Sequence, residues 1–394
     1  MDEVVIVGGA RTAFGKFGGV WKDKTAADLG GIAIGGALHR ANVHHSEVDE
    51  VMMGMALQAG AGQNPARQAA RSGGLDWQVP AETVNKVCAS GLRSLTMASQ
   101  VIRAGDAGVI VAGGMESMSQ APHMLSHARQ GLRLGDGKIV DLLHRDGLHC
   151  AFDPMHMGDY ANQIAAEYGV SRQAQDNWAL RSQQRAVESI RSGFFHDEIV
   201  PAAVVTKSGM SLTVETDEAP RPDTDAAKLA GLPLVFNGAG TITAGNAPGI
   251  NDGAAALVVM RKDRAVPGSS APHALILAHA AVSVEARNFP ITPALVIQKL
   301  LQQSGMDMQR IDLFEVNEAF AVVVLASGLI AGWDENKVNI HGGAIALGHP
   351  IGASGARIVL TLINGLRHRG GGYGIAAICS GGGQGDAVLI RVDG

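Results

Sequence analysis

The sequence predicts an α/β protein built from two similar halves, with a long segment inserted into the first half. Short runs rich in β-branched residues alternate with segments of helical apolar spacing, which is typical of βαβ units and mostly parallel sheets. The same order of motifs occurs twice along the chain. At 394 residues the chain is also too long for one ordinary domain.

The duplication is clearest where a helical segment leads into a strand. Residues 41–51 and 304–314 show the same pattern, and Asp49 and Asp312 set an offset of 263 residues between the halves. Adding the same offset to Cys88 gives position 351, which is close to His349.

The segments that follow His349 match the segments that follow Cys88. A predicted helix after Cys88 leads to a strand at 109–112, and a predicted helix after His349 leads to a strand at 375–378. The two loops therefore occupy equivalent places in the two halves.

The halves differ in length because the first one carries an insertion. The final strand of the second half, at 385–392, comes directly after a glycine run, whereas its counterpart at 253–260 comes only after residues 119–249. This insertion is more polar, has a predicted helix at Ala174–Ile190 and is rich in His and Arg, which indicates either a solvated surface or a lid that meets an anionic ligand or another subunit. The predicted segments are the first half at 1–118, the insertion at 119–249, the last strand of the first half at 250–268 and the second half at 269–394.

Composition excludes several classes of function. The net charge of -5, without a basic run, argues against a nucleic-acid partner. No apolar run reaches the length that spans a membrane, and the first residues do not form a secretory signal. Three widely spaced cysteines favour a reduced, cytoplasmic enzyme over a disulfide framework, and the histidines show no metal-ligand spacing.

Cys88 is the candidate nucleophile. It lies in Asn85–Gly91, immediately before a segment with helical apolar spacing that ends near Gly105. Unpaired N–H groups and the positive end of the helix dipole favour a thiolate at such a position. A buried cysteine that merely packs a helix end is the alternative that this stretch alone leaves open.

Three other loops carry catalytic residue types. His349 lies between Gly348 and Pro350 before the second-half helix, which makes it a candidate base. Asn317 follows a predicted strand, and Cys379 ends another strand before three glycines whose N–H groups can converge on an oxyanion. Cys150 has no such setting and is interpreted as structural.

Taken together, these motifs resemble the thiolase family over essentially the whole chain. The resemblance is carried by five stretches in the family's order: Asn85–Gly91, Gly245–Gly253, Asn317–Phe320, Gly348–Gly355 and Cys379–Gly383. It implies two βαβαβαββ halves packed as a five-layered α-β-α-β-α sandwich, with a loop domain inserted in the first half.

The resemblance also implies roles for the reactive residues. Cys88 would accept the acyl group with His349 as its base, and Cys379 would move the proton on the α-carbon. One oxyanion hole would use His349 and a water held by Asn317, and the other would use the N–H groups of Cys88 and Gly381. Coenzyme A thioesters would be substrates, so no cofactor and no metal is expected.

Among thiolases the sequence is most like the short-chain, biosynthetic type, which interconverts acetyl-CoA and acetoacetyl-CoA. The implied contacts to CoA and its pantetheine arm are Leu148, His156, Met157, Arg221, Ala247, Ala319 and Phe320. Pro248 replaces a serine often found after Gly-Asn-Ala, and the region Arg221–Leu229 is shorter than in the family, without a serine for the adenine. Phe289 stands near the acyl pocket of the family, either in its wall or outside it.

Two other functions fit the sequence less well. A ketoacyl synthase would carry His or Asn in place of Cys379, and a non-catalytic carrier would lack at least one of Cys88, His349 and Cys379. Within the family, a broader 3-ketoacyl-CoA thiolase is the alternative to an acetoacetyl-CoA enzyme. Residues 124–146 resemble the loop that joins two thiolase dimers into a tetramer, with a dimer as the alternative.

Overall fold

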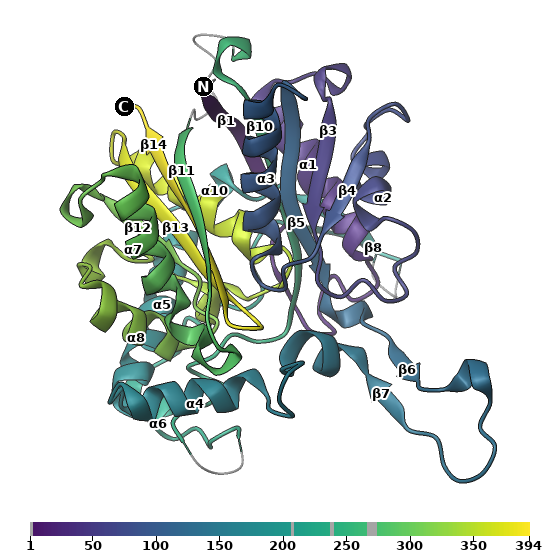
Figure 1. Cartoon of the computed structure of the whole chain (residues 1–394), viewed down its shortest axis with the longest axis vertical. Coiled ribbons are helices and arrows are strands. Elements are labelled where there is room, and N and C mark those ends of the chain that lie inside the picture. The colour runs from purple at the N-terminus through teal and green to yellow at the C-terminus, as the bar shows by residue number, and fades with distance from the viewer. Residues whose placement is uncertain (1–2, 206–208, 237–239, 266–273) are drawn as a thin grey trace.

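The computed structural model describes residues 3–205, 209–236, 240–265 and 274–394, and it shows two similar half-sheets that lie side by side (Figure 1). The predicted boundary between 268 and 269 lies outside the described residues. In the first half the half-sheet has the strand order β4-β3-β5-β10-β1. Its strands are β1 (Val4–Arg11), β3 (Glu50–Gly54), β4 (Ala81–Val84), β5 (Val109–Ser117) and β10 (Asn251–Arg261), with the short β2 (Gly15–Lys16) beside β10.

The second half repeats four of the five strands in the order β11-β14-β13-β12, and beside β12 the described residues show only an isolated parallel bridge between Phe314 and Val338. The half-sheets meet where β1 pairs with β11 at Val5 opposite Leu275 and Ile6 opposite Ala274. The strands are β11 (Ala274–Ser283), β12 (Leu313–Val316), β13 (Gly372–Ser380) and β14 (Gln384–Val392).

Both half-sheets are mixed, which corrects the expectation of mostly parallel sheets. β3 is parallel to β4 and β5, and β12 is parallel to β13, but β10 and β14 run antiparallel to both of their neighbours. The reason is that the last strand of each half starts at the end of the sheet where the preceding strand finishes, and in the first half the whole insertion makes this connection. In the second half a tight Gly381–Gly383 turn makes the connection, with positive φ at Gly382 and Gly383.

Helices cover both half-sheets and fill the space between them. The outer helices are α1 (Ala26–Ala41) and α2 (Pro65–Ser72) on the first half, and α7 (Thr292–Ser304) and α8 (Ala321–Ala331) on the second. The inner helices are α3 (Ser90–Ala104) and α10 (Ser354–His368), with the short α9 (Ala344–Leu347) preceding α10. The order helix, sheet, helix pair, sheet, helix confirms the predicted five-layered sandwich.

The apolar pattern of the strands produces these layers. In β1, Val5 and Val7 pack with the α1 side of the sheet, whereas Val4 and Ile6 pack in the inner cluster with α3 and α10. This alternation follows from the two-residue period of a strand and shows that both faces of the sheet are buried. The inner cluster joins residues of both halves into one core.

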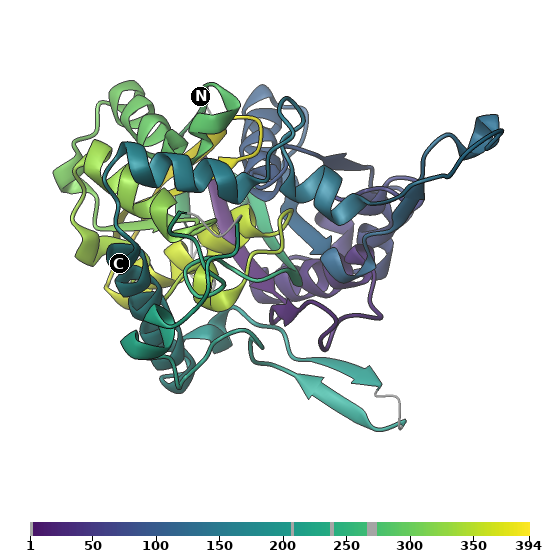
Figure 2. The ribbon, with the colours of Figure 1, turned by 90° about the horizontal axis from the view of Figure 1, so that it is seen from below.

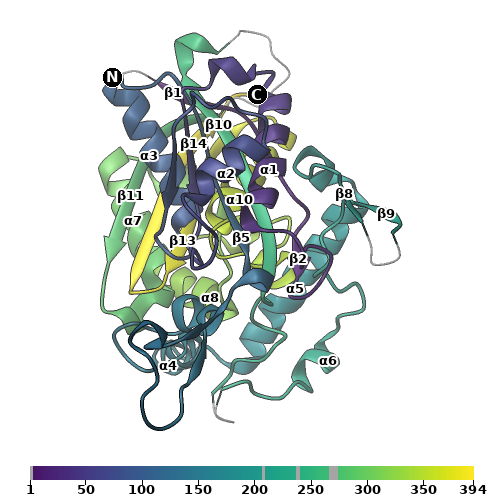
Figure 3. The same cartoon turned by 90° about the vertical axis from the view of Figure 1, so that its right-hand side faces the viewer.

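Much of the insertion lies at the end of the molecule opposite to both termini (Figure 1). It contains the β6–β7 hairpin (His123–Leu125 and Ile139–Asp141), α4 (Met157–Glu167), α5 (Arg172–Arg191), the β8–β9 hairpin (Ala202–Val205 and Ser211–Val214) and α6 (Ala226–Ala230). α5 confirms the helix predicted at Ala174–Ile190. Both hairpins extend away from the body of the protein (Figures 2 and 3). In the described part of the chain, no helix is both long and apolar enough to cross a membrane.

Candidate active site

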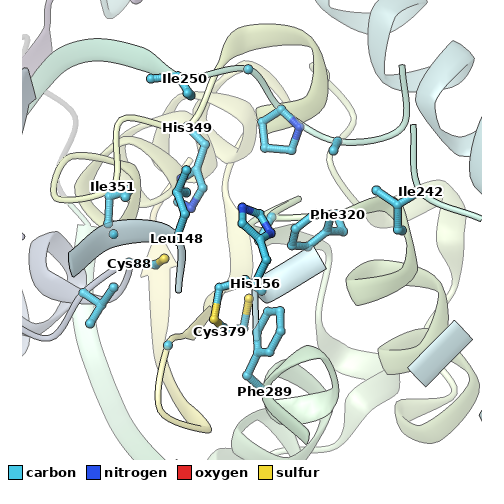
Figure 4. A pocket seen from close by; sticks show the side chains of 18 of the residues that line it. Cys88, Leu148, His156, Ile242, Ile250, Phe289, Phe320, His349, Ile351 and Cys379 are labelled. Carbon is cyan, nitrogen blue, oxygen red and sulfur yellow. The ribbon is translucent and has the colours of Figure 1, made fainter. Parts of the chain in front are cut away.

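A cavity of about 310 Å³ lies where the insertion covers the junction of the two halves. Figure 4 shows that side chains from both halves and from the insertion face into it. Most of the predicted site residues line this cavity: Cys88, Leu148, His156, Met157, Ala247, Ala319, Phe320, His349, Cys379 and Gly381. The structure therefore brings together residues that the sequence separates by almost 300 positions.

Cys88 lies just before the first turn of α3, as predicted. The N-cap residue Ala89 makes no side-chain capping bond, and the backbone N–H groups of Gly381 and Cys88 act to lower the pKa of the Cys88 thiol. Burial nevertheless dominates and raises the pKa of the Cys88 thiol to about 12, with a smaller contribution from the negative charge of Glu116. Cys88 is therefore a neutral thiol in the free enzyme and needs a base at the moment of attack.

The backbone before Cys88 is strained. Val87 has a φ of 48°, a conformation that is rare for a β-branched residue. Such a conformation costs of order 1–3 kcal/mol and persists only where the surrounding structure holds it in place. The strained residue turns the chain so that Cys88 faces the cavity.

His349 has the orientation that a base for Cys88 requires. Its Nδ1 lies 2.6 Å from the Ser354 hydroxyl, which itself donates its proton to the carbonyl of Pro350 at 2.9 Å. The hydroxyl must therefore accept from Nδ1–H, which leaves the lone pair on Nε2. In the described structure Nε2 has no hydrogen-bond partner, and the ring faces the cavity near the Cys88 sulfur (Figure 4).

The imidazole is also kept neutral. Burial, together with the positive charge of Arg357, lowers the pKa of His349 to about 4. The backbone N–H of His349 donates to Asn251 Oδ1 at 3.0 Å, which fixes the loop. A neutral imidazole with a free Nε2 can take the proton of Cys88 and return it later.

Cys379 is fully buried at the end of β13. Burial raises the pKa of its thiol well above the usual range, and the proximity of Cys88 raises it further. The side chains of both cysteines line the same cavity (Figure 4). A thiol of high pKa holds its proton until a strong base such as a carbanion forms beside it.

Asn317 follows β12 and is fully buried. Its backbone N–H donates to the carbonyl of Ala377 at 3.0 Å, while neither atom of its side-chain amide has a partner in the described structure. Asn317 is not part of the cavity wall itself. Its role in holding a water stays a prediction, and the unpartnered amide is compatible with it.

Arg221 is the predicted contact that the structure does not bring to the cavity. It lies at a separate surface depression with Arg191 and Thr224, and its backbone N–H donates to Gln183 of α5 at 2.8 Å. Its contact to CoA phosphates stays a prediction. Pro248, by contrast, lines the cavity, where it supplies no N–H donor.

Two residues of the site, Ser354 and Glu116, were not identified from the sequence. Ser354 orients His349, and Phe289 is buried in the cavity wall, which answers the question that the sequence left open. Glu116 accepts hydrogen bonds from the N–H groups of Ala56, Leu57 and Gly352 at 2.9 to 3.2 Å. An isolated carboxylate at the end of the apolar strand β5 was the available signal for Glu116.

The described residues contain no group of three or more His, Cys, Asp or Glu side chains placed to hold a metal ion. His144, His149 and His156 do cluster, with ring centroids 4.1 to 5.6 Å apart. Burial and the other two rings lower the pKa of His156 to about 4, and its Nδ1 accepts the Gly158 N–H at the start of α4. This histidine therefore shapes the cavity wall as a neutral ring.

A cysteine before a helix, a neutral imidazole and a second cysteine that face one acyl-sized cavity define an acyltransferase that works through a cysteine thioester. Comparison with known proteins identifies the family to which this acyltransferase belongs. Residues 4–263 match the thiolase N-terminal domain and residues 270–392 match the thiolase C-terminal domain. The chain belongs to the thiolase family.

Relatives are similar over their full length. The chain is 50% identical to an acetyl-CoA acetyltransferase of Escherichia coli (strain K12) over 392 residues, which covers 99% of each protein. It is 46% identical to that of Cupriavidus necator, covering 99% of this chain and 100% of the relative. The crystal structure of the Bacillus anthracis acetyl-CoA acetyltransferase superposes with a TM-score of 0.96 at 38% identity, covering 100% of this chain and 99% of the other. These matches confirm the predicted family and fold.

The hydrogen bond between Ser354 and His349 generates a testable prediction. In Ser354→Ala the Nδ1–H loses its acceptor, so the ring can rotate and the Nε2 lone pair is no longer held toward Cys88. We expect kcat to fall by about 10- to 100-fold, with a much smaller change in KM, because the loss is one of alignment. Steady-state kinetics on acetoacetyl-CoA measure both constants.

Ser327→Ala is the matched control for this experiment. Ser327 is also a buried serine that donates to a proline carbonyl, Pro290, but it is not part of the cavity wall. A wild-type kcat in Ser354→Ala, or an equal loss in Ser327→Ala, would contradict the orienting role.

Proposed function

We propose that the protein is an acetyl-CoA C-acetyltransferase, which cleaves acetoacetyl-CoA with CoA to two acetyl-CoA and catalyses the reverse condensation. The observation that carries this proposal is the convergence of Cys88, His349 and Cys379 on one small cavity. The printed names of the full-length relatives support the choice of substrate. A broader 3-ketoacyl-CoA thiolase is the alternative.

In cleavage, Cys88 attacks the 3-keto carbon of acetoacetyl-CoA while His349 Nε2 takes the thiol proton. The N–H groups of Cys88 and Gly381 are placed beside the Cys88 sulfur and would stabilise the oxyanion that forms there. The C2–C3 bond then breaks, and its electron pair is protonated at C2 by the Cys379 thiol. This step releases acetyl-CoA and leaves acetyl-Cys88 with Cys379 as a thiolate.

The second half of the reaction regenerates the enzyme. The thiol of CoA gives its proton to the Cys379 thiolate, and its sulfur attacks the acetyl group on Cys88. Cys88 leaves and recovers its proton from His349, so all protons are balanced. The exchange of one thioester for another costs little free energy, so the transfer of the acetyl group between Cys88 and CoA is readily reversible. No cofactor takes part in this scheme.

The experiment that tests this mechanism separates the two cysteines. After brief treatment with acetoacetyl-CoA and an acid quench, peptide mass mapping should find acetyl on Cys88. Cys379→Ser should still take an acetyl group from acetyl-CoA on Cys88, but should fail in carbon–carbon chemistry and in exchange of the acetyl-CoA methyl protons with deuterated water.

Cys150→Ser serves as the control and should keep wild-type activity, since Cys150 is not part of the cavity wall. Acetylation confined to Cys150 or Cys379, or normal proton exchange in Cys379→Ser, would contradict the assignment.

Two side chains would limit the length of the acyl chain. Met157 and Phe289 both line the cavity, and the Phe289 ring packs against Phe320 with centroids 6.4 Å apart and planes at 64°. Phe289 is held more firmly than the flexible Met157, because it is 2% exposed and aromatic. We therefore expect Phe289 to be the stronger barrier.

The predicted result is a steep fall in kcat/KM from acetoacetyl-CoA to 3-ketohexanoyl-CoA and 3-ketodecanoyl-CoA, since each excluded methylene is worth up to about 1–3 kcal/mol. Phe289→Ala should admit the longer substrates more than Met157→Ala, with little gain for acetoacetyl-CoA. Equal or rising kcat/KM values toward ten carbons in the wild type would favour the broader thiolase.

We further propose a tetramer assembled through residues 124–146. The β6–β7 hairpin extends from the body (Figure 2) and exposes Leu132, Leu134 and Ile139 to solvent, with Leu134 fully exposed. Apolar side chains at the tip of a long hairpin are typical of an interaction site.

Light scattering should give four times the 40.7 kDa chain mass for the wild type and twice the chain mass for the double variant Leu132→Asp/Leu134→Asp. A wild-type mass of twice the chain would reject the tetramer.

The cytoplasm is the proposed location. In the described structure Cys88, Cys150 and Cys379 are all free thiols, and the chemistry requires two of them in the reduced state. A reducing compartment satisfies this requirement.

A further inference from the structure

Lys86 and Asp386 form a buried ion pair beside the active site that the mechanism does not use. Lys86 Nζ lies 2.5 Å from Asp386 Oδ2, and the two side chains are 17% and 2% exposed. Arg93 is the other positive charge that acts on Asp386.

The pair connects the segments that carry the two cysteines. Lys86 is two residues before Cys88 in the first half. Asp386 lies in β14 directly opposite Ile378, the residue before Cys379 in β13. A second link runs beside the ion pair, because the Ser380 hydroxyl donates to the Lys86 carbonyl at 2.5 Å.

The loop that these links hold is the strained one. Val87, between Lys86 and Cys88, has a positive φ, and its side chain lies against Gly381. On the other side of the loop, Lys86 N–H donates to Ser90 Oγ at 2.8 Å, and that hydroxyl donates to the Val87 carbonyl at 2.6 Å. The loop is thus fastened to α3 at one side and to the β13–β14 hairpin at the other.

We propose that Lys86 and Asp386 are positioning residues, which hold the strained Val87 conformation and so keep the Cys88 sulfur against the Gly381 N–H and near Cys379. Without the ion pair, Val87 relaxes toward a normal φ and Cys88 turns away from the donors of the second half. The proposal rests on the two-cysteine chemistry of the proposed function, but its first test needs no CoA substrate.

That test is the rate at which iodoacetamide alkylates Cys88, followed by peptide mass mapping at fixed pH. Lys86→Met and Asp386→Asn each remove one charge, and we expect both to slow alkylation and to lower kcat by about 10- to 100-fold, with a smaller effect on KM. Lys262→Met is the matched control, because it breaks the exposed Lys262–Glu3 ion pair of 2.7 Å far along the sheet and should leave both rates unchanged.

The Val87→Gly variant distinguishes a positioning role of the Lys86–Asp386 ion pair from a merely structural one. Glycine adopts a positive φ without strain, so the ion pair is no longer needed to hold the loop. The loss caused by Lys86→Met should therefore be markedly smaller in the Val87→Gly background than in the wild type. Thermal unfolding of each variant shows whether it is folded. If Asp386→Asn does not fold, Lys86→Gln replaces it in the same measurements.

Two results would overturn the proposal. One is wild-type alkylation and kcat in folded Lys86→Met and Lys86→Gln. The other is an equal loss of rate in the presence and absence of Val87→Gly. If instead Cys88 alkylation depends on the pair as expected while no acetoacetyl-CoA is turned over, the positioning role stands and the proposed substrate is wrong.

Discussion

The close approach of α3 and α10 is the constraint on which the rest of the structure depends. The first turns of the two helices meet at glycines, and a methyl group added at Gly91 would lie 2.7 Å from the Gly352 carbonyl oxygen. At Gly114, on β5, an added methyl group would overlap the same oxygen. Because only hydrogen atoms fit there, the loops before the two helices, which carry Cys88 and His349, come together over one cavity. Glu116 reinforces this contact through the N–H of Gly352.

Burial then determines the charge state of the catalytic groups. The same desolvation that raises the pKa of Cys88 to about 12 lowers that of His349 to about 4, so the resting pair is a neutral thiol and a neutral imidazole. A neutral pair avoids the cost of burying two charges before the substrate arrives. The N–H of Gly381 and the free Nε2 of His349 are fixed in advance, and they act when charge develops during the reaction.

The insertion is fastened to both halves by buried polar contacts, so that it is a fixed wall of the cavity. On the first half, Arg11 pairs with Glu198 and Asp217 at 2.6 and 2.7 Å, with all three side chains fully buried. On the second half, Glu318 accepts from Trp178 and Ser182 of α5 at 2.9 and 2.7 Å. Removing one partner of such a buried charge typically costs about 3–5 kcal/mol. His156 and Met157, which line the cavity together with Cys379, belong to this insertion.

The sequence by itself determined the parts of this protein that depend on neighbouring residues. The helix after Cys88, the α5 helix and the glycine turn after Cys379 follow from local spacing, and the internal repeat aligns Cys88 with His349. The resemblance to thiolases supplied the other site residues, and ten of the twelve predicted site residues line the cavity. Only the tertiary structure decided the mixed strand directions, the place of Phe289 in the cavity wall, the position of Arg221 away from it, and the pairing of Lys86 with Asp386 across 300 residues. The reason is physical. Apolar periodicity and turn residues act over a few positions along the chain, whereas strand pairing and burial are set by the packing of segments that the sequence does not place side by side.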